Sequence, residues 1–260
     1  MPEGKLAVLE RQRARPASLW YLRPSVLIPV LSLAFAIATA SISYYQAQLQ
    51  DVRERRAELR GLVQRFYEFP REHADAAATY ADSPDLGRIT DWLRSEENLI
   101  VTQATQLAES LQDHLSSAEL YSVSVALEAR GDSIGSERFA ELAVARASVV
   151  REEIAALRQH ARLLFLNGKV APARERYQRL IRLVDELPDA TAPVLKSREN
   201  ANTLGAWAEL EAWAGNCHEA RQRLAASRGH FQAAGGIPDL EEYFAGVTAR
   251  VDACRQRETE

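Results

Sequence analysis

The sequence has 260 residues and a formal net charge of −4, so it has no basic field that would attract nucleic acid. Glycine (12 residues) and proline (10 residues) are few, whereas Ala, Leu, Arg, Glu and Gln are abundant. This composition is typical of an all-α protein.

The stretch at 24–45 contains no charged side chain. At about 1.5 Å per residue a helix of this length measures roughly 33 Å, enough to cross a hydrocarbon core of about 30 Å. Aromatic rings favour the headgroup region and flank both ends, as Trp20, Tyr21, Tyr44 and Tyr45. The sequence therefore predicts one transmembrane helix at 24–45, after a short basic tail at 1–23.

The placement of basic residues predicts the orientation of this single-pass helix. Arg23 abuts its N-terminal end, whereas the nearest basic residue beyond its other end is Arg53. Basic residues beside a span favour the cytoplasmic side. With an Ala- and Arg-rich composition typical of bacteria, we expect a bacterial inner-membrane protein whose C-terminal domain lies in the periplasm. A secretory signal peptide is the alternative, because Ala38-Thr39-Ala40 resembles a cleavage site.

Residues 46–69 predict a helical stalk. Its apolar residues follow a heptad-like spacing that Arg56 interrupts, and they are Leu49, Val52, Leu59, Val63 and Phe66. Two interpretations are open: a seam between the copies of a homodimer, or an amphipathic helix that packs on its own downstream domain. Small residues in the span, Ser32, Ala36 and Ala40, would let two anchors approach each other.

Residues 70–116 predict a helical linker region. We expect the stalk helix to end at Phe69-Pro70, because the residue before a proline avoids the helical conformation. A short helix at 71–80 and a turn around Pro84 follow. The next helix has one apolar face, formed by Ile100, Ala104, Leu107, Leu111 and Leu115.

Residues 117–257 contain a helical pattern that recurs three times. Each instance places a glycine at a turn and a small residue five positions later, in the pairs Gly131 and Ser136, Gly168 and Ala173, and Gly215 and Ala220. Glycine permits a tight turn, and the small side chain lets the second helix lie close against the first. The pattern therefore predicts successive helical hairpins.

The pattern resembles the tetratricopeptide repeat, a unit of about 34 residues. The best match is 154–187, which carries Leu157, Ala161, Leu164, Gly168, Ala173, Tyr177 and Leu180 at the expected places. The flanking units depart from it, with Ser136 in place of Ala and Glu211 in place of an apolar ring. The resemblance implies an α-solenoid closed by a capping helix at 239–256. A plain array of helical hairpins remains the alternative.

The resemblance also implies a concave groove that binds a partner, lined by the first helix of each unit. It would place on that groove Tyr121, Arg158, Arg162, Phe165, Asn202, Glu209 and Trp213. Arg158 and Arg162 lie one turn apart and could grip a carboxylate or an acidic peptide. The alternative is that both arginines form ion pairs with neighbouring glutamates.

The residues that carry chemistry are sparse. Cys217 and Cys254 could form a disulfide in an oxidising compartment, or remain two buried thiols. The histidines lack metal-ligand spacing, and no nucleophile or phosphate-loop motif is present. The sequence thus predicts no catalytic, cofactor-binding or metal-binding residue.

These features together predict a protein that is not an enzyme. We expect a membrane-anchored scaffold that binds other proteins of a bacterial envelope complex, or that holds client polypeptides. The alternatives are a sensory helical ectodomain, and the same repeat domain facing the cytoplasm as an adaptor.

Overall fold

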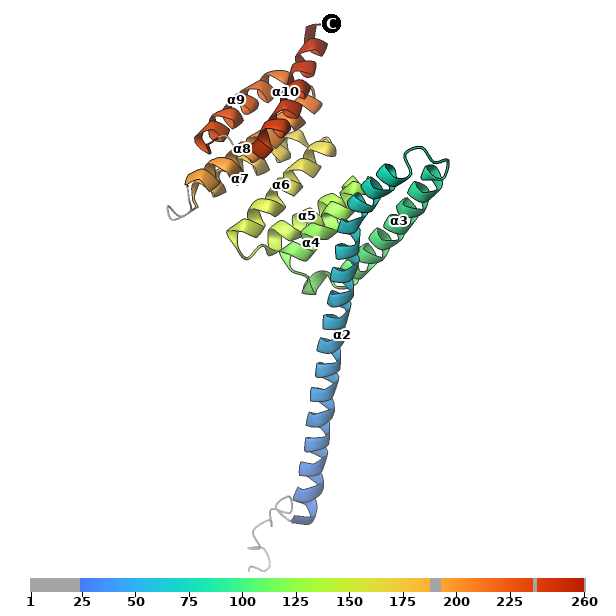
Figure 1. Ribbon diagram of the computed structural model, residues 1–260. Helices are drawn as coiled ribbons and strands as arrows, with labels where there is room; N and C mark the ends of the chain where they lie inside the picture. Colours follow the sequence, from blue (N-terminus) through green and yellow to red (C-terminus); the bar gives the residue numbers. More distant parts are fainter. Residues whose placement is uncertain (1–23, 188–192, 236–237, 260) are drawn as a thin grey trace, which may run out of the picture. The chain divides into compact units, whose positions relative to one another are not determined.

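The computed structural model of this chain describes residues 24–187, 193–235 and 238–259. These residues form helices and turns with no strand, which confirms the predicted all-α class (Figure 1). The predicted basic tail at 1–23 lies outside the described residues. The chain divides into two units, 1–54 and 55–260.

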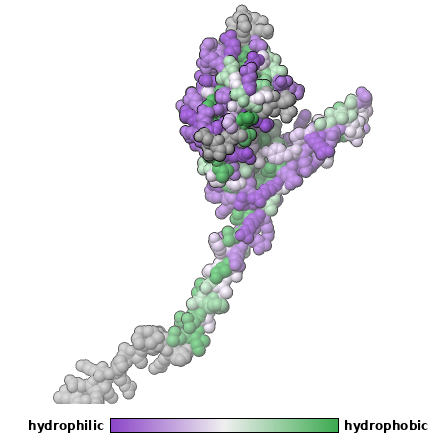
Figure 2. Space-filling model, turned by 60° about the vertical axis from the view of Figure 1, so that its left-hand side comes forward, coloured by the Kyte–Doolittle hydropathy of each residue, from purple (hydrophilic) through white to green (hydrophobic). Residues whose placement is uncertain are grey.

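The described part of the first unit belongs to helix α2 (Pro24–Thr79), which contains the predicted span. The helix is long and apolar enough to cross a membrane, by its length and composition. The apolar side chains of the predicted span are exposed, and Phe35 reaches 72% exposure. Figure 2 shows hydrophobic residues along this N-terminal part of α2. The Thr39 hydroxyl donates to the carbonyl of Phe35 at 2.5 Å, so the helix itself satisfies this polar group.

The expected helix end at Phe69-Pro70 is wrong, because α2 continues to Thr79. A proline inside a helix removes one backbone hydrogen bond and costs about 3 kcal/mol. Contacts on both sides of the proline oppose this cost. The Phe69 side chain is buried, and the Arg65 guanidinium forms ion pairs with Glu72 and with Glu96. Stalk and first linker segment are therefore one helix.

Helix α3 (Leu86–Ser110) lies beside the last part of α2, and the Arg65–Glu96 ion pair of 2.9 Å joins them (Figure 1). The apolar face of α3 is buried, and a short 3-10 helix, Gln112–His114, connects it to α4. Leu59 and Phe66 of α2 are also buried inside the second unit. For these two residues the structure shows packing on the chain's own domain, which was one of the two interpretations of the stalk.

Three helical hairpins follow in the second unit (Figure 1). They pair α4 (Ser117–Ala129) with α5 (Ser133–Arg146), α6 (Val150–Leu166) with α7 (Val170–Asp185), and α8 (Pro193–Trp213) with α9 (Cys217–Ala233).

The turns of the three hairpins share one geometry. Gly131, Gly168 and Gly215 have φ angles of 87°, 74° and 81°, a left-handed conformation that costs glycine little. In each turn the glycine N–H and the next N–H donate back to carbonyls of the preceding helix, as in a Schellman motif. The predicted small residues, Ser136, Ala173 and Ala220, are all fully buried. The hairpin prediction is therefore confirmed.

Helix α10 (Pro238–Thr259) packs on α8 and α9. It buries Phe244, Val247 and Val251 in a cluster with α8 and α9. A disulfide joins Cys217 of α9 to Cys254 of α10, with 5.6 Å between their Cα atoms. The helix thus covers the apolar face of the third hairpin, which a terminal element of a helical array has to do.

Candidate functional site

The first helices of the hairpins line a groove of about 350 Å³. Side chains reach it from α4, α6 and α8, while α7 adds Tyr177 and α10 adds Tyr243. Four residues that the sequence assigned to a partner groove meet here: Tyr121, Arg158, Arg162 and Glu209. We call this set, with Tyr243 and the other lining residues, the hairpin groove.

The other three predicted groove residues lie elsewhere. Trp213 is 60% exposed and lines an adjoining pocket of about 370 Å³, which shares Arg162 and Glu209 with the hairpin groove. Asn202 is half-buried on α8, outside the residues that line these two sites. Phe165 is fully buried in the core, with its ring centroid 6.1 Å from that of Tyr177, so it does not line the groove.

Both arginines of the hairpin groove form ion pairs within the protein. Arg158 Nη2 donates to Glu199 Oε2 at 2.6 Å, and Arg162 Nε donates to Glu128 Oε1 at 2.6 Å. Burial alone would lower the pKa of Arg162, but the hydrogen bond to Glu128 outweighs it and raises the pKa. In the structure, therefore, both arginines form ion pairs with glutamates. They do not form an open clamp for a carboxylate.

A buried hydroxyl lies among the lining residues of the hairpin groove. Tyr177 of α7 is fully buried, and its ring stacks on that of Trp207 with 5.3 Å between centroids. Within the described part of the chain, the Tyr177 hydroxyl has no hydrogen-bond partner, and neither has Nε of Arg158. Burial raises the pKa of Tyr177, so the hydroxyl keeps its proton at neutral pH. An unpaired buried donor costs about 1–3 kcal/mol, so these two donors mark a place where a bound acceptor would be stabilised.

Tyr177 was not predicted to be a groove residue, because it occupies the position of the large apolar residue in the second helix of the repeat pattern. The ring does fill that core site. The signal was the hydroxyl itself, because Phe or Leu would fill the same space without adding a polar atom.

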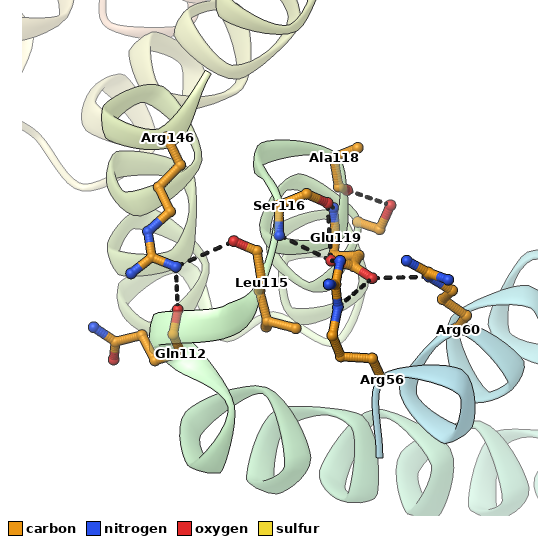
Figure 3. A network of polar contacts seen from close by, with 9 residues as sticks. Arg56, Arg60, Gln112, Leu115, Ser116, Ala118, Glu119 and Arg146 are labelled. Atoms are coloured by element: carbon orange, nitrogen blue, oxygen red, sulfur yellow. Dashed lines mark hydrogen bonds and ion pairs between the residues drawn. The ribbon is translucent and has the colours of Figure 1, made fainter. Parts of the chain in front are cut away.

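A second polar cluster lies where α2 meets α4 (Figure 3). Glu119 accepts hydrogen bonds from Arg56 and Arg60, each at 2.8 Å, and from the backbone N–H of Ser116 at 2.8 Å. Burial alone would raise the pKa of Glu119, but hydrogen bonds from Arg56 and Ser116 outweigh it and lower the pKa to about 2. Arg56, which interrupts the apolar spacing of the stalk, therefore fastens α2 to the first hairpin.

Arg146 of α5 fixes the connection that precedes α4 (Figure 3). Its Nη1 donates to the carbonyl oxygens of Gln112 and Leu115 at 2.5 and 3.1 Å. These carbonyls follow the end of α3, where the helix no longer supplies their partners. The polar groups around Arg146 therefore bond to one another within the protein, and they stabilise the fold.

Glu211 explains one departure from the repeat pattern. Its carboxylate is fully buried and accepts two hydrogen bonds of 2.7 Å from Arg174, one of 2.9 Å from Trp207 Nε1 and one of 2.9 Å from Asn216. Burial alone would raise the pKa of Glu211, but the bonds from Arg174 and Trp207 outweigh it and lower the pKa. The ion pair joins the second hairpin to the third.

Among the described residues, no group of three or more His, Cys, Asp or Glu side chains is arranged to hold a metal ion. Comparison of the chain with protein-family models, with curated proteins and with solved structures found no match. The hairpin groove and the apolar helix are therefore the features that bear on function.

Proposed function

We propose that this protein is a membrane-anchored scaffold whose helical-hairpin array binds other polypeptides of a bacterial envelope complex. The hairpin groove is the observation that carries the proposal. Its volume of about 350 Å³ lies within the range of about 300–1,000 Å³ that is usual for ligand sites. Its walls come from three hairpins and from α10, so the fold holds the lining side chains in fixed positions.

The anchoring half of the proposal is supported by α2. An apolar helix surface that is exposed in water is unfavourable, whereas the same surface is at no disadvantage in lipid. We place residues 24–45 in the inner membrane as a single span, with the second unit in the periplasm. The disulfide between Cys217 and Cys254 supports this side, because disulfides persist in oxidising compartments.

The interaction half is supported by the regularity of the hairpins. Three turns with the same left-handed glycine, each followed by a buried small residue, are what stacked repeats require. We infer a solenoid similar to the tetratricopeptide repeat, with α10 as its capping helix. Such arrays present a continuous inner surface to a partner chain.

Site-specific photocrosslinking in native membranes tests the binding role. A photoreactive amino acid replaces Trp213 beside the groove, and a matched variant carries it at Ile134, which is 78% exposed on α5. We expect adducts with a defined polypeptide from position 213 and none from position 134. Equal adducts at both positions, or none at either, would contradict the proposal.

Reporter fusions at the C-terminus test the orientation. Alkaline phosphatase is active in the periplasm, so we expect an active fusion and a dark fluorescent-protein fusion. The opposite pattern would place the hairpins in the cytoplasm and make the protein an adaptor there.

A further inference from the structure

Two unpaired hydrogen-bond donors lie at the hairpin groove, and contacts with neighbouring residues fix the positions of their side chains. Tyr177 is fixed by its stack on Trp207 and by Phe165. Arg158 is fixed at its tip, where Nη2 donates to Glu199 at 2.6 Å and to Thr203 at 3.2 Å. Its Nε is buried and has no partner. Both groups can donate a hydrogen bond, and both residues line the hairpin groove.

The charges around these donors balance. Arg158 and Arg162 pair with Glu199 and Glu128, and Arg250 pairs with Glu209 at 3.3 Å. Each cation of the groove thus already has its anion. An incoming carboxylate would find no uncompensated positive charge and would meet the carboxylates of Glu128 and Glu209, which line the groove. A neutral acceptor suits the site better than an acidic peptide.

The adjoining pocket is mainly apolar. Leu166, Leu210 and Ala212 line it together with Trp213, whose ring is 60% exposed. Leu210, Arg162 and Glu209 line both sites, so the pocket continues the hairpin groove. An apolar side chain placed there would cover the exposed indole ring and gain burial.

We propose that the hairpin groove binds an extended, uncharged polypeptide segment through one of its backbone carbonyls. The carbonyl oxygen accepts hydrogen bonds from the Tyr177 hydroxyl and from Arg158 Nε, and a neighbouring apolar side chain of the segment packs on Trp213. This inference rests on the proposed function and names the chemistry of the partner. It replaces the acidic ligand that the two arginines indicated in the sequence.

Peptide selection on the full chain in detergent tests the inference. Two pools of short peptides, blocked at both ends by acetylation and amidation, are incubated with the protein. One pool contains uncharged sequences rich in apolar residues, and the other carries Asp and Glu at alternate positions. Retained peptides are identified by mass spectrometry after size exclusion, and their affinities are measured by fluorescence anisotropy. We expect retention from the uncharged pool.

Tyr177→Phe removes the donor and leaves the ring in place. We expect the affinity for retained peptides to fall about five-fold, the usual worth of one neutral hydrogen bond. Tyr80→Phe is the matched control, because Tyr80 is 40% exposed at the end of α2 and lines neither site. It should bind as the unchanged protein does. Arg158→Lys keeps the charge beside Glu199 but removes the Nε donor, and should weaken binding to a similar degree.

Three other results of these experiments would each refute the inference. Preferred retention of the acidic pool, or an unchanged affinity in Tyr177→Phe, would refute it and leave the scaffold function standing. Retention of neither pool would also refute it, including the case in which detergent or a second copy of the chain fills the groove. Photocrosslinking at position 213 would then decide separately whether the scaffold function fails too.

Discussion

Trp207 lies between two regions that differ in their buried polar groups. On one side these groups are hydrogen-bonded, and on the other side one of them is not. Its indole N–H donates to Glu211, whose carboxylate is also held by Arg174 and Asn216. Its ring face stacks on Tyr177, whose hydroxyl has no hydrogen-bond partner among the residues that the structure describes. The Glu211 region is a closed network that joins hairpins, whereas Tyr177 is a buried residue in the wall of a groove. A satisfied buried polar group belongs to the architecture, whereas an unsatisfied one in the wall of a groove is a candidate for binding.

Replacing Glu211 with Ala should give the largest loss of stability, because it leaves Arg174, Trp207 and Asn216 without their acceptor. Breaking a buried ion pair by removing one partner costs about 3–5 kcal/mol, and we expect about 3 because Arg174 is itself 37% exposed. Urea unfolding of the full chain in mild detergent measures it. Glu186→Ala, at an exposed position, should change the free energy of unfolding by less than about 0.5 kcal/mol. Equal losses in the two variants would show that the Glu211 network does not stabilise the array.

Removing the disulfide should have an effect of similar size, since it frees α10 from its covalent link to α9. The bond closes a sequence separation of 37 residues, and cross-links of this span contribute about 2–4 kcal/mol. A Cys217→Ala, Cys254→Ala double variant should unfold at lower urea concentration. Dithiothreitol should destabilise the unchanged protein and leave the double variant unaffected. A reductant effect of equal size in both would mean that the bond does not contribute.

Much of the hairpin array was readable from the sequence, because its determinants are local. A glycine at a left-handed turn and a small residue five positions later are both required by backbone geometry. The end of α2 was not readable, since tertiary contacts of Arg65 and Phe69 override the preference of Pro70. The groove arginines were found, and so was the alternative that they form ion pairs with glutamates, but the glutamates themselves were not identified. Glu199 lies 41 positions from Arg158, and only the fold brings them together.

The Glu119 network should give a smaller effect that depends on pH. Its pKa is lowered to about 2 in the folded protein from the ordinary value of 4.5. A lowered folded-state pKa contributes stability above the unfolded value, and this contribution is lost as the pH falls from about 4.5 toward 2. This shift corresponds to roughly 3 kcal/mol, and solvent screening reduces it because the side chain of Arg60 is 63% exposed. Glu119→Gln should therefore lose about 2 kcal/mol at pH 7, and its deficit should shrink as the pH falls. Unfolding of both proteins at a series of pH values measures the difference. A deficit that stays constant down to pH 3 would refute an ionised Glu119 as the cause.

The smallest effect should come from Tyr177→Phe measured without a ligand, and its sign distinguishes the two sides of Trp207. No group in residues 24–187, 193–235 or 238–259 loses a partner when the hydroxyl is removed, because none of them bonds to it. Deleting an unpaired buried polar atom is neutral or raises stability by up to about 1 kcal/mol, so the urea midpoint should stay or rise. A loss of more than about 1 kcal/mol would instead place Tyr177 in a closed network like that of Glu211. Stability retained in the free protein, together with weaker peptide binding, is the combination that only a ligand-facing hydroxyl produces.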